Sequence, residues 1–397
     1  MIEIVPTLGR WPRAALGELC DIRGGFPAPQ DDAAFEEGEI PFVRMKDVGR
    51  HHFTNNLCET DHSLSRAHFE KGRYQLTPRG SILMPRSGSV GLNHRAILTI
   101  DAVVVSHLCA LVPTSDKVSP DFLYRFLCLA DMRKLTKKTT GLDSIAFSDL
   151  RMVAVPLPPL AEQRRIAEVL DRAEALRAKR RAALAQLDSL TQSLFLDLFG
   201  DPVPNPKGWP RKKFAEVGML DRGISKHRPR NAPELLGGHY PFVQTGEVAN
   251  CDGYICAQHG TYSEIGLRQS KLWPKGTLCI TIAANIAKTG ILTFDACFPD
   301  SIVGFSAEER ATVEYVRTWL SFLQKTLEDS APESAQKNIN LAILRDLSLP
   351  VPPIPLQREF ARRVTAVEAL KTAQRASLAE LDALFATLQH RAFRGEL

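Results

Sequence analysis

The sequence lacks most of the motifs by which catalytic and cofactor-binding proteins are recognised. It contains no GxxxxGK[ST] loop for a nucleoside triphosphate, no HExxH pair for zinc, and no GxGxxG loop placed after a strand. The Asn-Pro-Pro-aromatic tetrad of amino-methyltransferases is also missing. The nearest match to a PD-ExK nuclease, Pro299-Asp300 with Glu308-Glu309-Arg310, ends in Arg where Lys is required. The sequence therefore predicts a chain with no catalytic residues of its own.

Cysteines are few, and long apolar runs are absent. The eight cysteines form no pair of CxxC motifs and no Cys-His set at zinc-finger spacing, so we expect reduced, mostly buried thiols. His51, His52 and His62 are poorly spaced for a metal and have no counterpart later in the chain. No run approaches the ~18 apolar residues of a membrane helix, and the N-terminus has no apolar signal segment. We expect a cytoplasmic protein without a metal site or membrane contact.

The charge balance is close to neutral. Fifty Lys and Arg residues face forty-five Asp and Glu residues, a formal net charge of +5. This excess permits a polyanionic partner such as double-stranded DNA without requiring one. The composition, 44% hydrophobic and 24% charged, is that of a folded globular protein, and 397 residues allow two or three domains.

The chain repeats itself at an offset of about 195 to 200 residues. Chance would not preserve both the order and the offset of several words, so the repetition indicates a duplication. The repeated words include Trp-Pro-Arg at 11–13 and 209–211, Pro-Phe-Val at 41–43 and 241–243, Ile-Leu-Thr at 97–99 and 291–293, and a Pro-rich step at 156–159 and 350–353.

Each half contains a globule followed by a long helix. The first part of each half is punctuated by Gly and Pro and contains short β-type runs, which predicts a mixed α/β globule. Residues 160–199 and 356–394 contain neither Gly nor Pro, which predicts a long helix in each half, and Gly200 and Gly395 then stand where C-terminal caps belong. The predicted domains are residues 1–155, 156–201, 202–349 (with a linker at 202–210) and 350–397.

Apolar residues form one stripe along each predicted helix, at spacings of three, four and seven. The stripes include Leu176 and Leu190 in the first helix and Leu370 and Leu384 in the second. Two such stripes in one chain most simply bury each other as a coiled coil. Periodicity does not decide between parallel and antiparallel pairing, but the tandem order and the short Pro-rich exit at 202–206 favour an antiparallel pair. The predicted fold is therefore α+β, with two mixed α/β globules separated by a pair of long antiparallel coiled-coil helices and an internal pseudo-twofold repeat.

Two pairs of equivalent loops have compositions suited to DNA contacts. The loop 86–95 is rich in Gly and Ser, so its backbone can approach a surface closely, and its Arg, Asn and His side chains can donate to bases or phosphates. Its counterpart, 283–290, shares the position but not the residues, as expected either of two readers of different half-sites or of a variable surface loop. The segments 137–141 and 334–340 mix cations with amides and hydroxyls, which suits phosphate contacts but also polar turns.

The candidate DNA-binding residues come from these loops and from the positions that follow the repeated Pro-Phe-Val. They are Arg44, Lys46, Arg86, Ser87, Ser89, Asn93, His94, Arg95, Lys137, Lys138, Thr139, Gln244, Thr245, Asn285, Lys288, Gln336, Lys337 and Asn338.

The order of globule, Pro-rich step and long helix, present twice, resembles the specificity (S) subunit of type I restriction-modification enzymes. The resemblance covers essentially the whole chain. Pro355-Leu356 and Leu142-Asp143-Ser144 depart from the family pattern. The words that carry the resemblance are VPLPPLAEQRRIA at 155–167, LPVPPI at 349–354 leading to Gln357-Arg358, AQKNI at 335–339, and PRGSIL with RSGSVG at 78–91.

The resemblance implies a non-catalytic subunit with two target recognition domains, each reading one half of a bipartite site. The helices would space these domains and dock two modification (M) subunits, which carry S-adenosylmethionine and methylate adenine. Restriction (R) subunits would add cleavage that depends on ATP and Mg, so no cofactor is expected in this chain. We expect the chain alone to bind DNA weakly, and a helical turn inserted after Asp171 to lengthen the unread spacer. Two alternatives stay open: a self-sufficient DNA methyltransferase or nuclease, and a coiled-coil scaffold that binds proteins.

Overall fold

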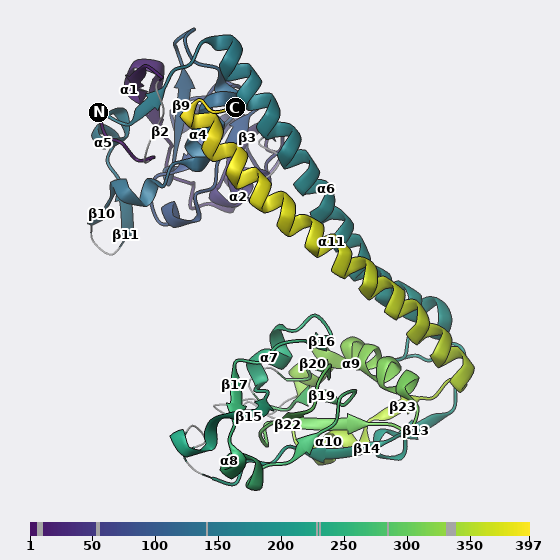
Figure 1. The fold of residues 1–397 in the computed structure, drawn as a ribbon. Coiled ribbons are helices and arrows are strands. Elements are labelled where there is room, and N and C mark those ends of the chain that lie inside the picture. Colours follow the sequence, from purple (N-terminus) through teal and green to yellow (C-terminus); the bar gives the residue numbers. More distant parts are fainter. Residues whose placement is uncertain are drawn as a thin grey trace. The chain divides into compact units, whose positions relative to one another are not determined.

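The computed structural model describes residues 1–5, 11–52, 56–139, 142–227, 229, 232–283, 286–330 and 339–397. The chain divides into two compact units. Unit 1 comprises Met1–Ala182 and Arg375–Leu397, and unit 2 comprises Ala183–Gln374. Each unit therefore contains one globule together with half of each long helix (Figure 1).

The globule of unit 1 contains a five-stranded sheet and a three-stranded sheet. Most neighbouring strands are antiparallel, whereas β4–β7 and β3–β8 are parallel. The larger sheet has the order β2 (Cys20–Gly24), β9 (Leu108–Pro113), β6 (Ile82–Pro85), β7 (Ala96–Leu98), β4 (Asn56–Leu57), and the smaller β5 (His62–Leu64), β3 (Ile40–Val43), β8 (Val103–Val104). Two further pairs are β1 (Arg13–Ala15) with β12 (Ala154–Pro156), and β10 (Thr136–Thr139) with β11 (Leu142–Ile145). The helices are α1 (Leu16–Leu19), α2 (Met45–His51), α3 (Arg66–Lys71), α4 (Pro120–Leu129) and α5 (Phe147–Arg151), with short 3-10 turns η1 (Asp32–Phe35), η2 (Val90–Leu92) and η3 (Met132–Leu135).

The globule of unit 2 repeats the order of the five-stranded sheet and adds a fourth strand, β18, to the smaller sheet, which confirms the predicted duplication. Its sheets have the orders β14 (Met219–Arg222), β22 (Ile302–Ser306), β19 (Leu278–Thr281), β20 (Thr289–Leu292), β16 (Tyr254–Ile255), and β17 (Gly260–Tyr262), β15 (Leu236–Phe242), β21 (Ala296–Cys297), β18 (Leu272–Trp273), with β13 (Arg211–Lys213) pairing β23 (Ser348–Pro350). The helices are α7 (Thr245–Asn250), α8 (Glu264–Arg268), α9 (Arg310–Ser330) and α10 (Leu341–Asp346), with 3-10 turns η4 (Phe214–Glu216) and η5 (Pro233–Leu235).

A central strand in each globule joins two apolar cores. Along β6 the side chains alternate, so that Ile82 and Met84 pack into the core that includes α4, while Leu83 packs into the core beneath the smaller sheet. Along β19, Ile280 and Cys279 divide between two cores in the same way. Burial on both faces explains why these strands read as uninterrupted apolar runs.

The two long helices are α6 (Leu160–Phe199) and α11 (Ile354–Arg394). The first has the predicted bounds. The second begins at Ile354 rather than at 356, because Pro355 lies in its first turn, where a missing amide hydrogen costs no helical hydrogen bond. Gly200 and Gly395 adopt the left-handed conformation, with φ of 78° and 75°, which confirms the predicted caps.

The helices pair in an antiparallel sense, as predicted. In unit 1 the first half of α6 contacts the second half of α11, where Arg177 Nε donates to Asp382 Oδ1 at 2.6 Å. In unit 2 the second half of α6 contacts the first half of α11, where Lys371 Nζ lies 3.0 Å from Asp188 Oδ1. Contacts between early residues of one helix and late residues of the other require opposite directions.

The apolar residues of the two predicted stripes are not all buried between the helices. Ile166 and Leu170 are buried in the core of the unit 1 globule, together with Phe393 from the other helix. The two helices pair as predicted, but they bury only part of each stripe, because four of the leucines are substantially exposed. These are Leu176 (51%), Leu190 (37%), Leu370 (53%) and Leu384 (50%).

None of the helices in the described part of the chain combines the length and the hydropathy of a membrane span.

Candidate nucleic-acid interface

The loop after β6 is bound to the β10–β11 hairpin, so the structure brings two predicted DNA-binding segments together in unit 1. Ile145 N donates to Arg86 O at 3.0 Å, and Gly88 N donates to Asp143 O at 3.2 Å. Ser87 forms an isolated bridge with Ser144. Predicted residues from both segments, Arg86, Ser87 and Lys137, therefore lie on adjoining elements of one globule.

Side chains from other elements hold this loop in place. The Arg86 guanidinium lies over the Phe147 ring, 4.5 Å from its centroid, and Ser87 Oγ is 2.9 Å from His107 Nδ1. Lys137 Nζ is 2.7 Å from Asp149 Oδ2. Sequence reasoning missed Phe147 and His107, because they come from α5 and from the turn before β9 and share no motif with the loop.

The end of the loop turns into the globule, which corrects the prediction for Arg95. Its side chain is fully buried, and its guanidinium donates to His94 O at 2.6 Å and to Asn93 Oδ1 at 2.7 Å. Burial lowers the pKa of Arg95, and its Nε has no hydrogen-bond partner among the described residues. A guanidinium in this position cannot reach DNA, so Arg95 is part of the interior of the globule.

Asn93 and His94 also make contacts within the globule. Asn93 adopts the left-handed conformation, with φ of 53°, and its Nδ2 donates to Cys128 O at 2.9 Å. The His94 ring lies 5.1 Å from the ring of His52, and burial lowers the pKa of both histidines. In this arrangement Asn93 and His94 pack the loop against its neighbours, whereas Arg86, Ser87 and Ser89 at the start of the loop keep partial exposure.

Unit 2 contains a hydrogen bond equivalent to the one that joins the loop after β6 to the β10–β11 hairpin. Ile339 N donates to Ile282 O at 3.0 Å, which is the counterpart of the bond between Ile145 and Arg86. Lys288 is half-buried, and its backbone amide donates to Thr281 Oγ1 at 3.1 Å. Asn285, Gln336, Lys337 and Asn338 lie outside the described residues, as do the side chains of Lys138 and Thr139, whose backbones pair within β10–β11.

The candidates after the repeated Pro-Phe-Val stand at helix N-termini. In α2 the amide of Arg44 donates to Asp47 Oδ2 at 2.7 Å, and in α7 the amide of Gln244 donates to Glu247 Oε2 at 3.1 Å. The Gln244 side chain is exposed.

The cationic side chains near α2 have local partners. The Arg44 guanidinium lies 4.9 Å from the centroid of Phe35. Lys46, with a side chain that is 83% exposed, lies 3.8 Å from Asp61. Thr245 is the half-buried first residue of α7. Of these four candidates, Lys46 and Gln244 are the most open to solvent.

The Pro-rich step before each long helix has a structural role that sequence reasoning left unassigned. Gln163 is fully buried, its Nε2 donates to Pro158 O at 2.9 Å, and its Oε1 accepts from Ser119 N at 2.8 Å. Gln357 donates to Pro352 O at 2.7 Å. The recurrence of Gln five residues after the proline in both halves was the available signal. Each Gln side chain therefore joins the first turn of its helix to the Pro-rich segment that precedes it.

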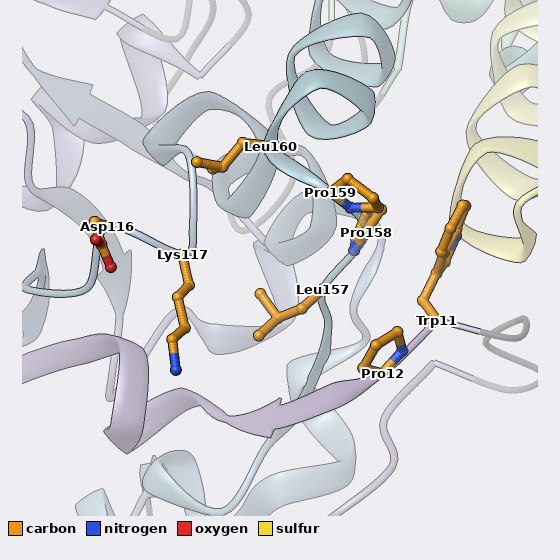
Figure 2. Close-up of a pocket in the computed structure, with 8 residues that line it drawn as sticks. All are labelled: Trp11, Pro12, Asp116, Lys117, Leu157, Pro158, Pro159 and Leu160. Atoms are coloured by element: carbon orange, nitrogen blue, oxygen red, sulfur yellow. The ribbon is translucent and has the colours of Figure 1, made fainter.

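An open apolar pocket of about 820 Å³ lies at the start of α6. Figure 2 shows Trp11 and Pro12 on one side and Asp116 and Lys117 on the other, with the Leu157–Leu160 run between them. None of the predicted DNA-binding residues that the structure describes lines it. Within the described residues, no group of three or more His, Cys, Asp or Glu side chains could hold a metal ion.

A duplicated α+β domain with a long helix after each copy is the class of protein that these observations define. The model of the type I restriction modification DNA specificity domain matches residues 10–186 and 206–382, and the chain belongs to this family. The match confirms the predicted family, the two recognition domains and DNA recognition as the function. The family is defined by DNA specificity and not by catalysis, which agrees with the prediction that this chain is not itself an enzyme.

Individual relatives agree with this assignment. The chain is 25% identical to the EcoBI type I restriction enzyme specificity subunit of Escherichia coli, over 98% of this chain and 86% of that one. It is 19% identical to the MjaIX specificity subunit of Methanocaldococcus jannaschii, over 88% and 85%. The crystal structure of the type I S subunit from M. genitalium has a similar fold, with a TM-score of 0.59, 16% identity and coverage of 99% and 98%.

Proposed function

We propose that this chain reads a bipartite sequence in double-stranded DNA, one half with each globule, as the S subunit of a cytoplasmic type I restriction-modification complex. The observation that carries the proposal is a backbone arrangement that the two globules share. The loop after the central strand is bonded to the segment before the last short helix by equivalent hydrogen bonds, from Ile145 to Arg86 and from Ile339 to Ile282. Different side chains on the same backbone arrangement suit two domains that recognise different DNA sequences.

Partner subunits supply the chemistry in this proposal. Two M subunits bind S-adenosylmethionine and methylate adenine, and R subunits use ATP and Mg to cut DNA. This chain binds none of these cofactors. The absence of catalytic motifs from its sequence supports this division of labour over a self-sufficient methyltransferase or nuclease.

The proposal is tested by expressing the chain with its M subunit in cells that lack adenine methylation and sequencing the methylated genome. The expected result is adenine methylation at a single bipartite motif with an unread spacer of constant length. The purified chain, given DNA, Mg and S-adenosylmethionine, should methylate and cut nothing. A continuous motif, or activity of the chain alone, would contradict the proposal.

Arg86 and Arg95 should respond differently to substitution by Ala, although they lie in the same loop. Arg86→Ala removes a partly exposed cation and is expected to weaken specific DNA binding by the complex by about 1–3 kcal/mol, with little change in thermal stability. Arg95→Ala empties a fully buried site and leaves Asn93 Oδ1 without its donor, so the free energy of unfolding should fall by about 2–4 kcal/mol. Thermal denaturation and fluorescence anisotropy with labelled DNA measure the two effects. Equal loss of stability in both variants would show that Arg86 is structural.

The exposed leucines of the helices form two equivalent surfaces, which we assign to the M subunits. Leu190 and Leu370 line an open groove of about 420 Å³ in unit 2, and their repeat counterparts in unit 1 are Leu384 and Leu176. Changing Leu190 and Leu370 to Lys places charge in a surface that docking would bury, and is expected to lower the number of bound M subunits from two to one. Native mass spectrometry of the complex measures this number. Leu196→Lys is the matched control, because Leu196 is 42% exposed on the same helix and its repeat counterpart is His390.

A further inference from the structure

A cluster of charged residues joins the two long helices within unit 1. Arg177 of α6 donates from Nε to Asp382 Oδ1 of α11 at 2.6 Å and also pairs with Glu174 on its own helix. The side chains of Glu174 and Arg177 are only 9% and 17% exposed. Arg181 adds to the cluster, because its Nη1 donates to Glu174 Oε1 at 2.9 Å. We call Glu174, Arg177 and Asp382 the unit 1 triad.

A second cluster joins the helices within unit 2. Lys371 of α11 lies 3.0 Å from Asp188 Oδ1 of α6 and 3.2 Å from Glu368 Oε1 on its own helix. Lys371 is only 4% exposed, which is rare for a lysine and is tolerated when its charge is paired. We call Glu368, Lys371 and Asp188 the unit 2 triad.

The two triads are copies of each other in the repeat. Each helix carries a Glu, a cation three residues later, and an Asp eleven residues after the cation. The cation always pairs with the Glu of its own helix and with the Asp of the other helix. Because eleven residues make about three helical turns, the cation and the Asp of each helix lie on the same face. Both cross-helix pairs therefore form at one axial register of an antiparallel pair and separate at any other.

The middle part of the apolar stripe defines this register weakly, whereas in unit 2 Phe195 and Phe199 of α6 pack on Phe360 of α11, with ring centroids 5.7 and 5.4 Å apart. The stripe repeats at three, four and seven residues, so a shift by one heptad would place apolar residues against apolar residues again. Several of its leucines are also exposed, including Leu176 and Leu370, and lose little on such a shift. The same shift would take Asp188 away from Lys371 and leave a nearly buried ammonium group without its cross-helix partner.

We infer that Asp188 and Asp382, with the cations they contact, are the positioning residues that fix the register of α6 against α11 and thereby the length of the unread DNA spacer. The statement about register is independent of the function, whereas the statement about the spacer rests on the proposed function. Their partial exposure, 57% for Asp188 and 46% for Asp382, allows either side chain to be changed without opening a core.

The register can be measured by disulfide crosslinking, with the exposed Cys58 and Cys256 first changed to Ser. Leu190→Cys with Leu370→Cys reports the native register, because both residues line one groove. Leu190→Cys with Arg363→Cys reports a register shifted by one heptad, about 10 Å along the helix, which a disulfide cannot span in the native register. With the triads unsubstituted, the pair Leu190→Cys with Leu370→Cys should form at least about tenfold more disulfide than the pair Leu190→Cys with Arg363→Cys.

The decisive variant is Asp188→Asn with Asp382→Asn. It removes the cross-helix partners but leaves each cation paired with the Glu of its own helix, and Arg181, which lies 3.6 Å from Asp382, also keeps its contact with Glu174. The preference for the native crosslink is expected to fall to threefold or less. Asp188→Glu with Asp382→Glu is the matched control and should keep the tenfold preference. If the Asn variant does not fold, Asp188→Asn alone and Asp382→Asn alone are measured, and each is expected to lower the preference partly.

A single native register in every Asn variant would overturn the inference and show that the burial of the helix ends in the globules fixes the register. The spacer is tested separately, by sequencing methylated DNA from cells that contain the complex with the Asn variant. Methylation at two or more spacer lengths is the expected result. A mixed register with one constant spacer would overturn the link to the spacer. Absence of methylation by the unsubstituted complex would count against the proposed function and leave the crosslinking result intact.

Discussion

Exchanging residues 1–155 for the first globule of another specificity subunit is expected to change one half of the recognised DNA sequence and to leave the other half unchanged. The reason is that the globule of unit 1 has its own sheets and its own apolar cores, to which no described residue of the second globule contributes. Because each mismatched base pair costs about 1–3 kcal/mol, replacing a half-site of several bases should reduce methylation of the original motif by at least about a hundredfold. Sequencing of methylated DNA from cells with the chimera and the M subunit measures the new motif.

The exchange must preserve the contact between the globule and the end of α11. Phe393 of α11 packs against Phe122 and Phe126 of α4, with ring centroids 5.4 and 5.8 Å apart. A donor globule with aromatic residues at these two positions keeps this contact. The reciprocal exchange of residues 202–349 is the control and should change only the other half of the motif. A chimera that alters both halves at once would show that the globules do not read DNA independently.

The duplication and the long helices could be predicted from sequence because their signals are repeated or long. The absence of Gly and Pro across 160–199 leaves few alternatives to a helix, and the glycine that follows ends it by a local conformational preference. The absence of Pro predicts a start of α11 that is two residues late, because the first helical turn accepts Pro355.

The candidate interface was predicted only in part, because composition does not show which way a side chain points. Arg86 and Arg95 have the same chemistry and lie nine residues apart, yet one stacks on Phe147 at partial exposure and the other is fully buried. Between them Val90 is buried in the globule, while Leu92 is exposed, and this alternation of buried and exposed positions cannot be read from composition. The extent to which the leucine stripes are buried could not be predicted for a related reason: periodicity identifies an apolar face but not how much of it a partner helix covers.

The ion triads show a kind of information that sequence reasoning passed over. Charged residues on a long helix are usually solvated, and that is how the sequence interprets Arg180-Arg181, whereas Arg181 belongs to the unit 1 cluster. The repetition of Glu, cation and Asp at identical spacings in both helices was nevertheless visible in the sequence. When both copies of a repeat keep the same charge pattern, and each cation can meet an acidic residue of the other helix, the pattern indicates cross-helix pairing.

Lengthening both helices by one turn within unit 1 is expected to lengthen the unread spacer by one to two base pairs and to leave both half-sites unchanged. Four residues are inserted after Asp171 in α6 and four after Leu388 in α11. They add about 6 Å at ~1.5 Å per residue, compared with ~3.4 Å per base pair of DNA. The insertion in α6 alone is a poorer test, because Ile166 and Phe393 from the two helices are buried in one core. One of these contacts or the unit 1 triad would then have to break.

The measurement is methylation of a DNA library in which both half-sites are fixed and the spacer length varies. The complex with the double insertion should prefer the longer spacer by at least about tenfold, since one misplaced half-site forfeits several base contacts. Four residues inserted into the linker at 202–210 form the control, because this segment lies outside both helices, and the preferred spacer should stay unchanged. A constant spacer after the double insertion would mean that the helices do not determine the distance. The spacing would then have to be set by the M subunits that hold the DNA.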